Sequence, residues 1–301
     1  MKRTLLVAAL FSLVGFVRAD DLEDQYTKLK DAVAKKDADA VKTEGAATFK
    51  LAQELVNAPQ PKEAGEVNDW KARVDYGKDV VSYTEYALAA VAAESQDPAK
   101  TIDLVNTLLA QNPKSKYLDE CASAYLAALG KNGGVAKQLD GMKKIVAGRP
   151  DNEAALQALA EGLLNRSPNE ALNYANRLVA ALSKKGKPEG VSEADWERAR
   201  TTYLASGYYI AGAINATKQN WTDCDRDMKA ALPLIKDSLR LGVVNYYLGI
   251  SNYQLAKITL DKPRMQLALK YVQTAAGIPG PLKSQAAHDM LLIQNELQGR
   301  K

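Results

Sequence analysis

The spacing of apolar residues constrains the fold of this chain more than any other feature. From Asp20 onward, apolar side chains recur every three or four positions, and short clusters of Pro, Gly, Asn and Asp interrupt them at intervals of about fifteen to twenty residues. Such spacing places apolar side chains on one face of an α-helix, and the interrupting clusters are typical of turns. Alanine is abundant and aromatic residues make up only 7% of the chain, which favours helix over strand. The sequence therefore predicts an all-α protein.

Local signals mark where individual helices begin. Asp97 can cap a helix that starts at Pro98, and Ser192 suggests another cap. Ser167, Pro168 and Glu170 form the pattern of a capping box with proline at the first helical position. Together with the apolar spacing, these signals predict thirteen helices, over residues 22–33, 41–56, 63–95, 98–112, 116–129, 134–147, 153–164, 168–183, 192–218, 221–238, 239–256, 263–276 and 282–297.

The helices are predicted to form a repeat. Pro113, Pro150 and Pro188 each end a helical stretch and are 37 and 38 residues apart. One helical hairpin cannot bury its own apolar stripe, so neighbouring hairpins are expected to stack. We predict an α-solenoid of about six hairpins over residues 20–280, closed by a C-terminal capping helix within residues 281–301. An irregular helical bundle and a closed ring of hairpins are the alternatives.

The first nineteen residues have the pattern of a signal peptide. Lys2 and Arg3 give the chain a basic start, and a thirteen-residue apolar run follows. Residues of small or medium size then precede a predicted cleavage site after Ala19. A helix of that length covers about 20 Å, against roughly 30 Å for a membrane core, so we expect export rather than stable membrane insertion. Cleavage lowers the formal net charge from +4 to +1, which excludes a nucleic-acid-binding surface of the usual basic kind. We expect a periplasmic or secreted protein.

The residues that enzymes and metal sites need are scarce. With one His, neither a Ser-His-Asp mechanism nor an H-E-x-x-H zinc site is expected, and no phosphate-binding glycine loop occurs. Asp223, Asp225 and Asp227 imitate the first half of a calcium loop, but Met228 and Leu234 stand where that loop needs glycine and glutamate. We read the three aspartates as acids near a helix start, with Thr222 as its cap. The sequence predicts no catalytic residue, no cofactor and no metal.

Two cysteines, Cys121 and Cys224, could form a disulfide in an exported protein. Both lie inside apolar helical patterns, so buried, small hydrophobic side chains are the preferred interpretation.

Several segments resemble the tetratricopeptide-repeat family. Tyr247-Leu248-Gly249 with Tyr253 is similar to the first-helix signature of that family, in which a small residue lets the paired helix approach closely. The repeat period here exceeds the 34 residues of the family. Three triplets match the second-helix pattern of the tetratricopeptide-repeat family: Ala268, Val272 and Ala275; Cys224, Met228 and Ala231; and Ala171, Ala175 and Leu178. The resemblance implies that first helices line a concave groove that holds a protein or peptide.

Tyrosines are the candidate binding residues. The chain has 14 Tyr against 3 Phe, and the tyrosines cluster on expected first helices. A tyrosine ring buries area while its hydroxyl stays hydrogen-bonded, which suits a recognition surface. Ordinary packing at half-exposed helix margins is the alternative for each residue. The predicted partner-binding residues are Tyr83, Tyr86, Tyr208, Tyr209, Tyr246 and Tyr253.

These observations predict an exported, non-catalytic scaffold that binds a protein or peptide partner through its concave groove. One alternative is a helical-ring hydrolase that cleaves envelope polysaccharide with a pair of carboxylates. Another is a small-ligand binder whose concave face closes over an apolar molecule.

Overall fold

The computed structural model describes residues 19–188 and 190–299. The predicted signal peptide falls almost wholly outside these residues. The described part of the chain is all-helical, as predicted. Its helices are α1 (Ala19–Ala34), α2 (Ala38–Val56), α3 (Val67–Glu94), α4 (Pro98–Gln111), α5 (Leu118–Gly148), α6 (Glu153–Leu163), α7 (Pro168–Lys184), α8 (Glu193–Thr217), α9 (Trp221–Ala231), α10 (Ser238–Thr259), α11 (Lys262–Gly277) and α12 (Lys283–Leu297), with short 3-10 turns η1 (Ala64–Glu66) and η2 (Leu232–Leu234).

Twelve helices in the described residues replace the thirteen predicted ones because α5 joins two of them. The backbone of α5 is not helical at Gly133 and Gly134, and Gly134 has φ of 68°. A positive φ is readily adopted only by glycine, so the chain kinks where the sequence predicted a break. The two predicted segments therefore lie on either side of this kink.

The predicted helix 221–238 ends early. The structure has α9 stopping at Ala231, followed by η2 and a fresh start at Ser238. Pro233 is the physical reason, because its ring clashes with the carbonyl one turn earlier and it lacks the N–H that continues a helix. Thr222 is not the cap of α9 either, since Asn220 occupies the N-cap position.

Two of the four capping predictions, Asp97 and Ser192, are confirmed. The Asp97 carboxylate accepts a hydrogen bond from the backbone N–H of Ala99 at 2.9 Å, and Ser192 accepts one from Asp195 at 3.1 Å. Ser167 differs, because its hydroxyl is 3.0 Å from the Glu170 carboxylate and caps no backbone N–H. Pro168 still begins α7 as predicted.

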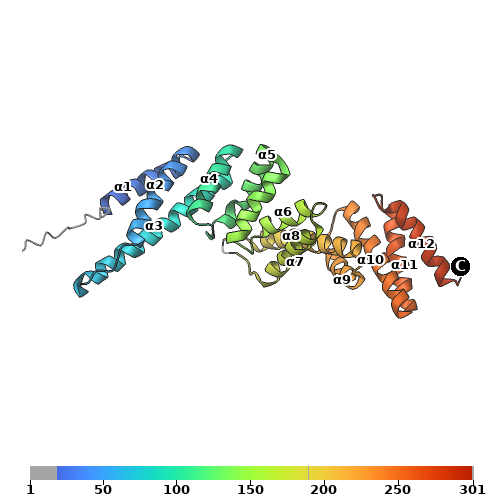
Figure 1. The fold of residues 1–301 in the computed structure, drawn as a ribbon. Helices are drawn as coiled ribbons and strands as arrows, with labels where there is room; N and C mark the ends of the chain where they lie inside the picture. Colours follow the sequence, from blue (N-terminus) through green and yellow to red (C-terminus); the bar gives the residue numbers. More distant parts are fainter. Residues whose placement is uncertain (1–18, 189, 300–301) are drawn as a thin grey trace, which may run out of the picture.

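The helices follow one another along an elongated molecule, and α1 and α12 lie at opposite ends (Figure 1). Within the described residues, α-helices whose backbones approach closely are one or two positions apart along the chain. The largest cluster of buried apolar side chains extends from Leu29 to Ile214. Smaller clusters continue this core toward the N-terminal and C-terminal ends of the molecule. The closed ring considered from the sequence is not the arrangement of these helices.

Gly249 has the role expected from its Leu-Gly pair. A Cβ at this position would lie 2.2 Å from Val272 Cγ2 and 3.3 Å from the Ala268 carbonyl oxygen. The absence of a side chain is therefore what lets α10 and α11 pack so closely.

The last helix covers the apolar face of α11. Ala286 and Ile293 of α12 are fully buried, and Met290 and Leu297 pack beside them, so α12 makes this contact through its apolar face. None of the described helices is long and apolar enough to cross a membrane.

Both cysteines are buried free thiols, as preferred from the sequence. Burial raises the pKa of each thiol to about 12, so the reactive thiolate is scarce at neutral pH.

Candidate functional site: a row of tyrosines

Four tyrosine rings form a continuous row across the first five helices. Tyr26 lies on α1, Tyr83 and Tyr86 lie on α3, and Tyr117 is the residue just before α5. Successive ring centroids are 5.1, 6.0 and 5.7 Å apart, with interplanar angles of 84°, 53° and 65°. We call these four residues the tyrosine row. Edge-to-face and tilted contacts of this kind are favourable beyond the area they bury.

Helical spacing explains how α3 supplies the middle of the row. Tyr83 and Tyr86 are three residues apart and so share one face of the helix. Tyr83 is half-buried against the core, whereas Tyr86 is 41% exposed. Tyr76, two turns before Tyr83, continues the same face and is 37% exposed. This face of α3 thus presents aromatic area to solvent.

A lysine lies over the ring at each end of the row. Lys30 Nζ is 4.4 Å from the centroid of Tyr26, and Lys116 Nζ is 5.0 Å from that of Tyr117. Both distances are within cation–π range. Neither lysine forms an ion pair within residues 21–188 and 190–299. Each terminal ring therefore has an ammonium group over it, and a carboxylate lies near each end of the row: Asp79 near Tyr26 and Glu120 near Lys116.

Two phenols of the row, those of Tyr26 and Tyr83, have a pKa above the usual value for tyrosine. Burial, followed by the neighbouring phenols of Tyr26 and Tyr86, raises the pKa of Tyr83. Burial also raises the pKa of Tyr26, with smaller contributions from Tyr76 and Asp79. The Tyr117 hydroxyl lies 3.2 Å from Ser82 Oγ, whereas those of Tyr26, Tyr83 and Tyr86 make no hydrogen bond with the described residues. Three phenols are therefore available to a ligand.

Tyr208 and Tyr209 lie half-buried on α8, away from the row. The Arg240 guanidinium is 5.5 Å from the Tyr209 centroid, and burial raises the pKa of Tyr209. Hollows of about 490 and 290 Å³ flank α8. Both are lined by Arg198 and Thr202, so they adjoin along the face that α6, α8 and α10 share.

Tyr246 and Tyr253 are covered by α12 rather than presented to a groove. The Tyr246 hydroxyl donates to Asp289 at 3.0 Å, and that of Tyr253 donates to Glu296 at 2.6 Å. Tyr253 is only 7% exposed. Because both hydroxyls are engaged by the last helix, we leave these two residues out of the candidate site.

Sequence reasoning identified Tyr83 and Tyr86 but missed Tyr26 and Tyr117. Tyr26 is the single tyrosine of its predicted helix, over residues 22–33, and Tyr117 stands alone in a turn. Tyr26 and Tyr117 contact the tyrosines of α3 only because neighbouring hairpins stack. No local sequence pattern predicts that contact. Tyr83 and Tyr26 are 57 positions apart in the sequence.

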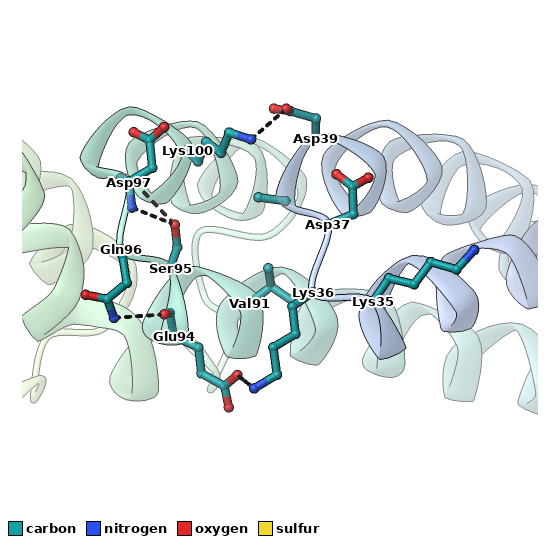
Figure 2. A pocket seen from close by; sticks show the side chains of 11 residues that line it. Lys35, Lys36, Asp37, Asp39, Val91, Glu94, Ser95, Gln96, Asp97 and Lys100 are labelled. Carbon is teal, nitrogen blue, oxygen red and sulfur yellow. Dashed lines mark hydrogen bonds and ion pairs between the residues drawn. The ribbon is translucent and has the colours of Figure 1, made fainter.

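A polar hollow of about 690 Å³ lies between the α1–α2 turn and the α3–α4 turn (Figure 2). Lys36 pairs with Glu94 at 2.7 Å, and Lys100 pairs with Asp39 at 2.9 Å. These pairs run between the two turns, so most of the charge that lines the hollow is neutralised internally. Exposed pairs of this kind add little stability.

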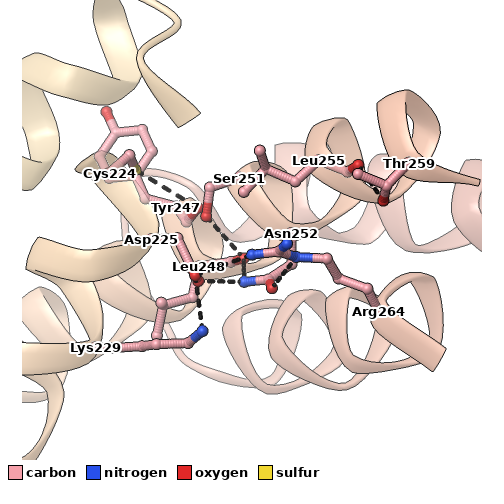
Figure 3. A network of polar contacts seen from close by, with 10 residues as sticks. All are labelled: Cys224, Asp225, Lys229, Tyr247, Leu248, Ser251, Asn252, Leu255, Thr259 and Arg264. Carbon is pink, nitrogen blue, oxygen red and sulfur yellow. Dashed lines mark hydrogen bonds and ion pairs between the residues drawn. The ribbon is translucent and has the colours of Figure 1, made fainter. Parts of the chain in front are cut away.

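Asp225 of α9 is tied into the packing between helices (Figure 3). Asp225 is 7% exposed and accepts hydrogen bonds from Lys229 at 2.7 Å, Asn252 at 2.6 Å and Arg264 at 3.2 Å. These contacts join α9 to α10 and α11. Asp227 accepts from Asn215 at 3.0 Å. No group of three or more His, Cys, Asp or Glu in the described residues is arranged to hold a metal ion.

No model of a known protein family matches this chain, and no curated protein matches it.

Proposed function

We propose that this protein is an exported, non-catalytic scaffold: an open α-solenoid of tetratricopeptide-like hairpins that binds an extended segment of a protein or peptide partner. The order of helix contacts supports the solenoid, because helices whose backbones approach closely are near neighbours along the chain. The close approach of α11 to Gly249 and the signal-like start of the sequence support the family and the export, respectively.

The tyrosine row is the observation that carries the binding proposal. It runs from α1 across α3 to the start of α5, so it joins three successive hairpins. Tyr86 of the row and the nearby Tyr76 are exposed. Rigid, amphipathic aromatic side chains are enriched where proteins recognise other proteins. A row that crosses helices also suits an extended ligand better than a compact one.

The hydrolase alternative is less well supported. It needs carboxylates gathered inside a closed ring, and α1 and α12 lie at opposite ends of the described chain (Figure 1). Asp225 and Asp227 of α9 are held by partners from neighbouring helices rather than aimed into an open cavity.

Selection from a displayed peptide library tests the proposal. Residues 20–301 would be immobilised and peptides enriched on the unaltered protein, then re-tested on a Tyr83→Ala/Tyr86→Ala variant. We expect enriched peptides to lose at least ten-fold in binding. Tyr174→Ala is the matched control, because Tyr174 is a half-buried tyrosine on α7, outside the row. Enriched peptides that bind the double variant as well as the unaltered protein would contradict the proposal.

A further inference from the structure

We propose that the outward face of α12 pairs this chain with a second copy of itself, with the two α12 helices running antiparallel. This inference goes beyond the proposed function, because the tyrosine row lies on α1, α3 and the start of α5, toward the other end of the molecule (Figure 1). It is drawn from the place of α12 in the stack and from the kind and spacing of the side chains on its outward face.

The outward face of α12 is apolar where a terminal helix is usually polar. Stacked repeats end in a unit whose outer side is polar, which keeps such proteins soluble. Leu291 and Leu292 are instead 56% and 38% exposed, and they lie on the side of α12 opposite the buried Ile293. Helical spacing sets both leucines on one stripe with three further exposed residues. We call this stripe the end face; it consists of Ser284, His288, Leu291, Leu292 and Asn295.

None of the other described helices covers the end face. The backbone of α12 approaches those of α10 and α11, and the side chains that α12 buries there include Ala286 and Ile293. Figure 1 places α12 at one end of the molecule and α1 at the other. The two exposed leucines therefore present apolar area that a second molecule can bury.

The absence of Lys, Arg, Asp and Glu from the end face favours a second copy as the partner. The two carboxylates of α12 accept hydrogen bonds from tyrosines of α10 instead, Asp289 from Tyr246 at 3.0 Å and Glu296 from Tyr253 at 2.6 Å. In a symmetric contact between two copies, the same patch lies on both sides, so charges of one sign would repel one another. A neutral face avoids that repulsion, whereas a strongly charged partner would find no opposite charge on it.

The spacing of the end face is complementary to itself. When two copies run antiparallel about an axis between Leu291 and Leu292, Leu291 of each copy lies opposite Leu292 of the other. In the same register His288 lies opposite Asn295, whose amide offers both a donor and an acceptor to the imidazole. Antiparallel helices also place the positive end of one helix dipole beside the negative end of the other. One stripe thus supplies both the apolar and the polar contacts of the pair.

Analytical ultracentrifugation of residues 20–301 tests the pairing. We expect a monomer–dimer equilibrium over protomer concentrations from about 1 to about 500 µM. Leu291→Lys/Leu292→Lys sets ammonium groups against their copies and should weaken dimerisation by about ten-fold or more. Its circular dichroism spectrum should not change, because both side chains are exposed. Val135→Lys is the control and should dimerise as the unaltered protein does, since Val135 is 43% exposed on α5, which does not approach α12.

Three outcomes would overturn the inference. The first is a monomer at every concentration, and the second is a dimer that Leu291→Lys/Leu292→Lys leaves unchanged. The third is a monomer that floats with phosphatidylglycerol vesicles through the two leucines, which would identify the end face as a lipid-binding surface. Loss of pairing should leave peptide binding at the tyrosine row unchanged, so this inference and the proposed function fail separately.

Cysteine cross-linking tests the antiparallel register. The thiol of Leu292→Cys would lie near the symmetry axis and should form a disulfide with its own copy on mild oxidation. The two thiols of Ser284→Cys would be about 22 Å apart along the helix axis and should not. Cys121 and Cys224 are buried and stay out of the reaction. Cross-linking of Ser284→Cys as efficient as that of Leu292→Cys would overturn the antiparallel pairing.

Discussion

The hydroxyl of Tyr253 donates a hydrogen bond to Oε1 of Glu296 at 2.6 Å, and this bond joins α10 to α12 across 43 residues of sequence. Two turns earlier on α10, Tyr246 makes the equivalent bond to Asp289 of α12 at 3.0 Å. Two parallel phenol–carboxylate bonds thus fix the last helix over the apolar face of α11. They make α12 an integral part of the packing.

We expect Tyr253→Phe to loosen α12 without changing the fold. The substitution keeps the buried ring and removes one hydrogen bond to a charged group, which lowers the free energy of local opening by about 1 to 2 kcal/mol. Amide hydrogen exchange in α12 should therefore become at least five-fold faster. Tyr174→Phe is the control, since the Tyr174 hydroxyl makes no hydrogen bond with the described residues. Unchanged exchange in the Tyr253→Phe variant would show that the bond does not hold the helix.

Stability should fall at alkaline pH through the same two tyrosines. Burial, followed by the negative charge of Asp289, raises the pKa of Tyr246, and burial followed by Glu296 raises that of Tyr253. Unfolded tyrosines have a pKa of about 10. Above that pH the unfolded chain loses these protons before the folded chain does, so the stabilisation is complete below about pH 10 and is lost as pH rises.

Urea denaturation at pH 8 and pH 11 measures this effect. The unaltered protein should lose more stability between the two pH values than a Tyr246→Phe/Tyr253→Phe variant, which has no phenol to ionise at these positions. Equal losses in the two proteins would contradict the account.

Gly249→Ala should destabilise the contact between α10 and α11. The added Cβ would meet Val272 Cγ2 at 2.2 Å and the Val272 backbone nitrogen at 3.1 Å, so the helices must separate. We expect a loss of about 1 to 3 kcal/mol in the free energy of unfolding measured with urea. Gly277→Ala is the matched control, because nothing lies within 4 Å of its added Cβ. A Gly249→Ala protein as stable as the control would refute the close approach.

The two thiols should be inert in the folded protein. Burial raises the pKa of Cys121 and of Cys224 to about 12, so at pH 8 the thiolate fraction is on the order of one in 10,000. Ellman's reagent should label neither cysteine in buffer and both in concentrated urea. Rapid labelling of either cysteine in buffer would place that thiol at the surface. Labelling of neither in urea would indicate a disulfide.

The helices were largely predictable because their signals are local. Apolar spacing located them, and Asp97, Ser192 and the glycines at 133 and 134 marked starts and a break. The early end of α9 was predictable in principle from Pro233, whose clash with the preceding turn outweighs the apolar spacing that continues beyond it.

The candidate site was predictable only in part because it is assembled by stacking. Tyr83 and Tyr86 stand close in sequence and could be found by clustering. Tyr26 and Tyr117 join them only through packing between hairpins. Tyr253 was assigned to a groove because its segment resembles a first helix that lines one, and the sequence does not show that α12 covers this side of α10.

Small-angle X-ray scattering of residues 20–301 in dilute solution tests the open arrangement of helices most directly, since the binding proposal depends on it. A compact chain of this length would have a radius of gyration of roughly 19 Å. We predict a value well above that, with a pair-distance distribution extended by a long tail. A radius near the compact value, with a symmetrical distribution, would contradict the account.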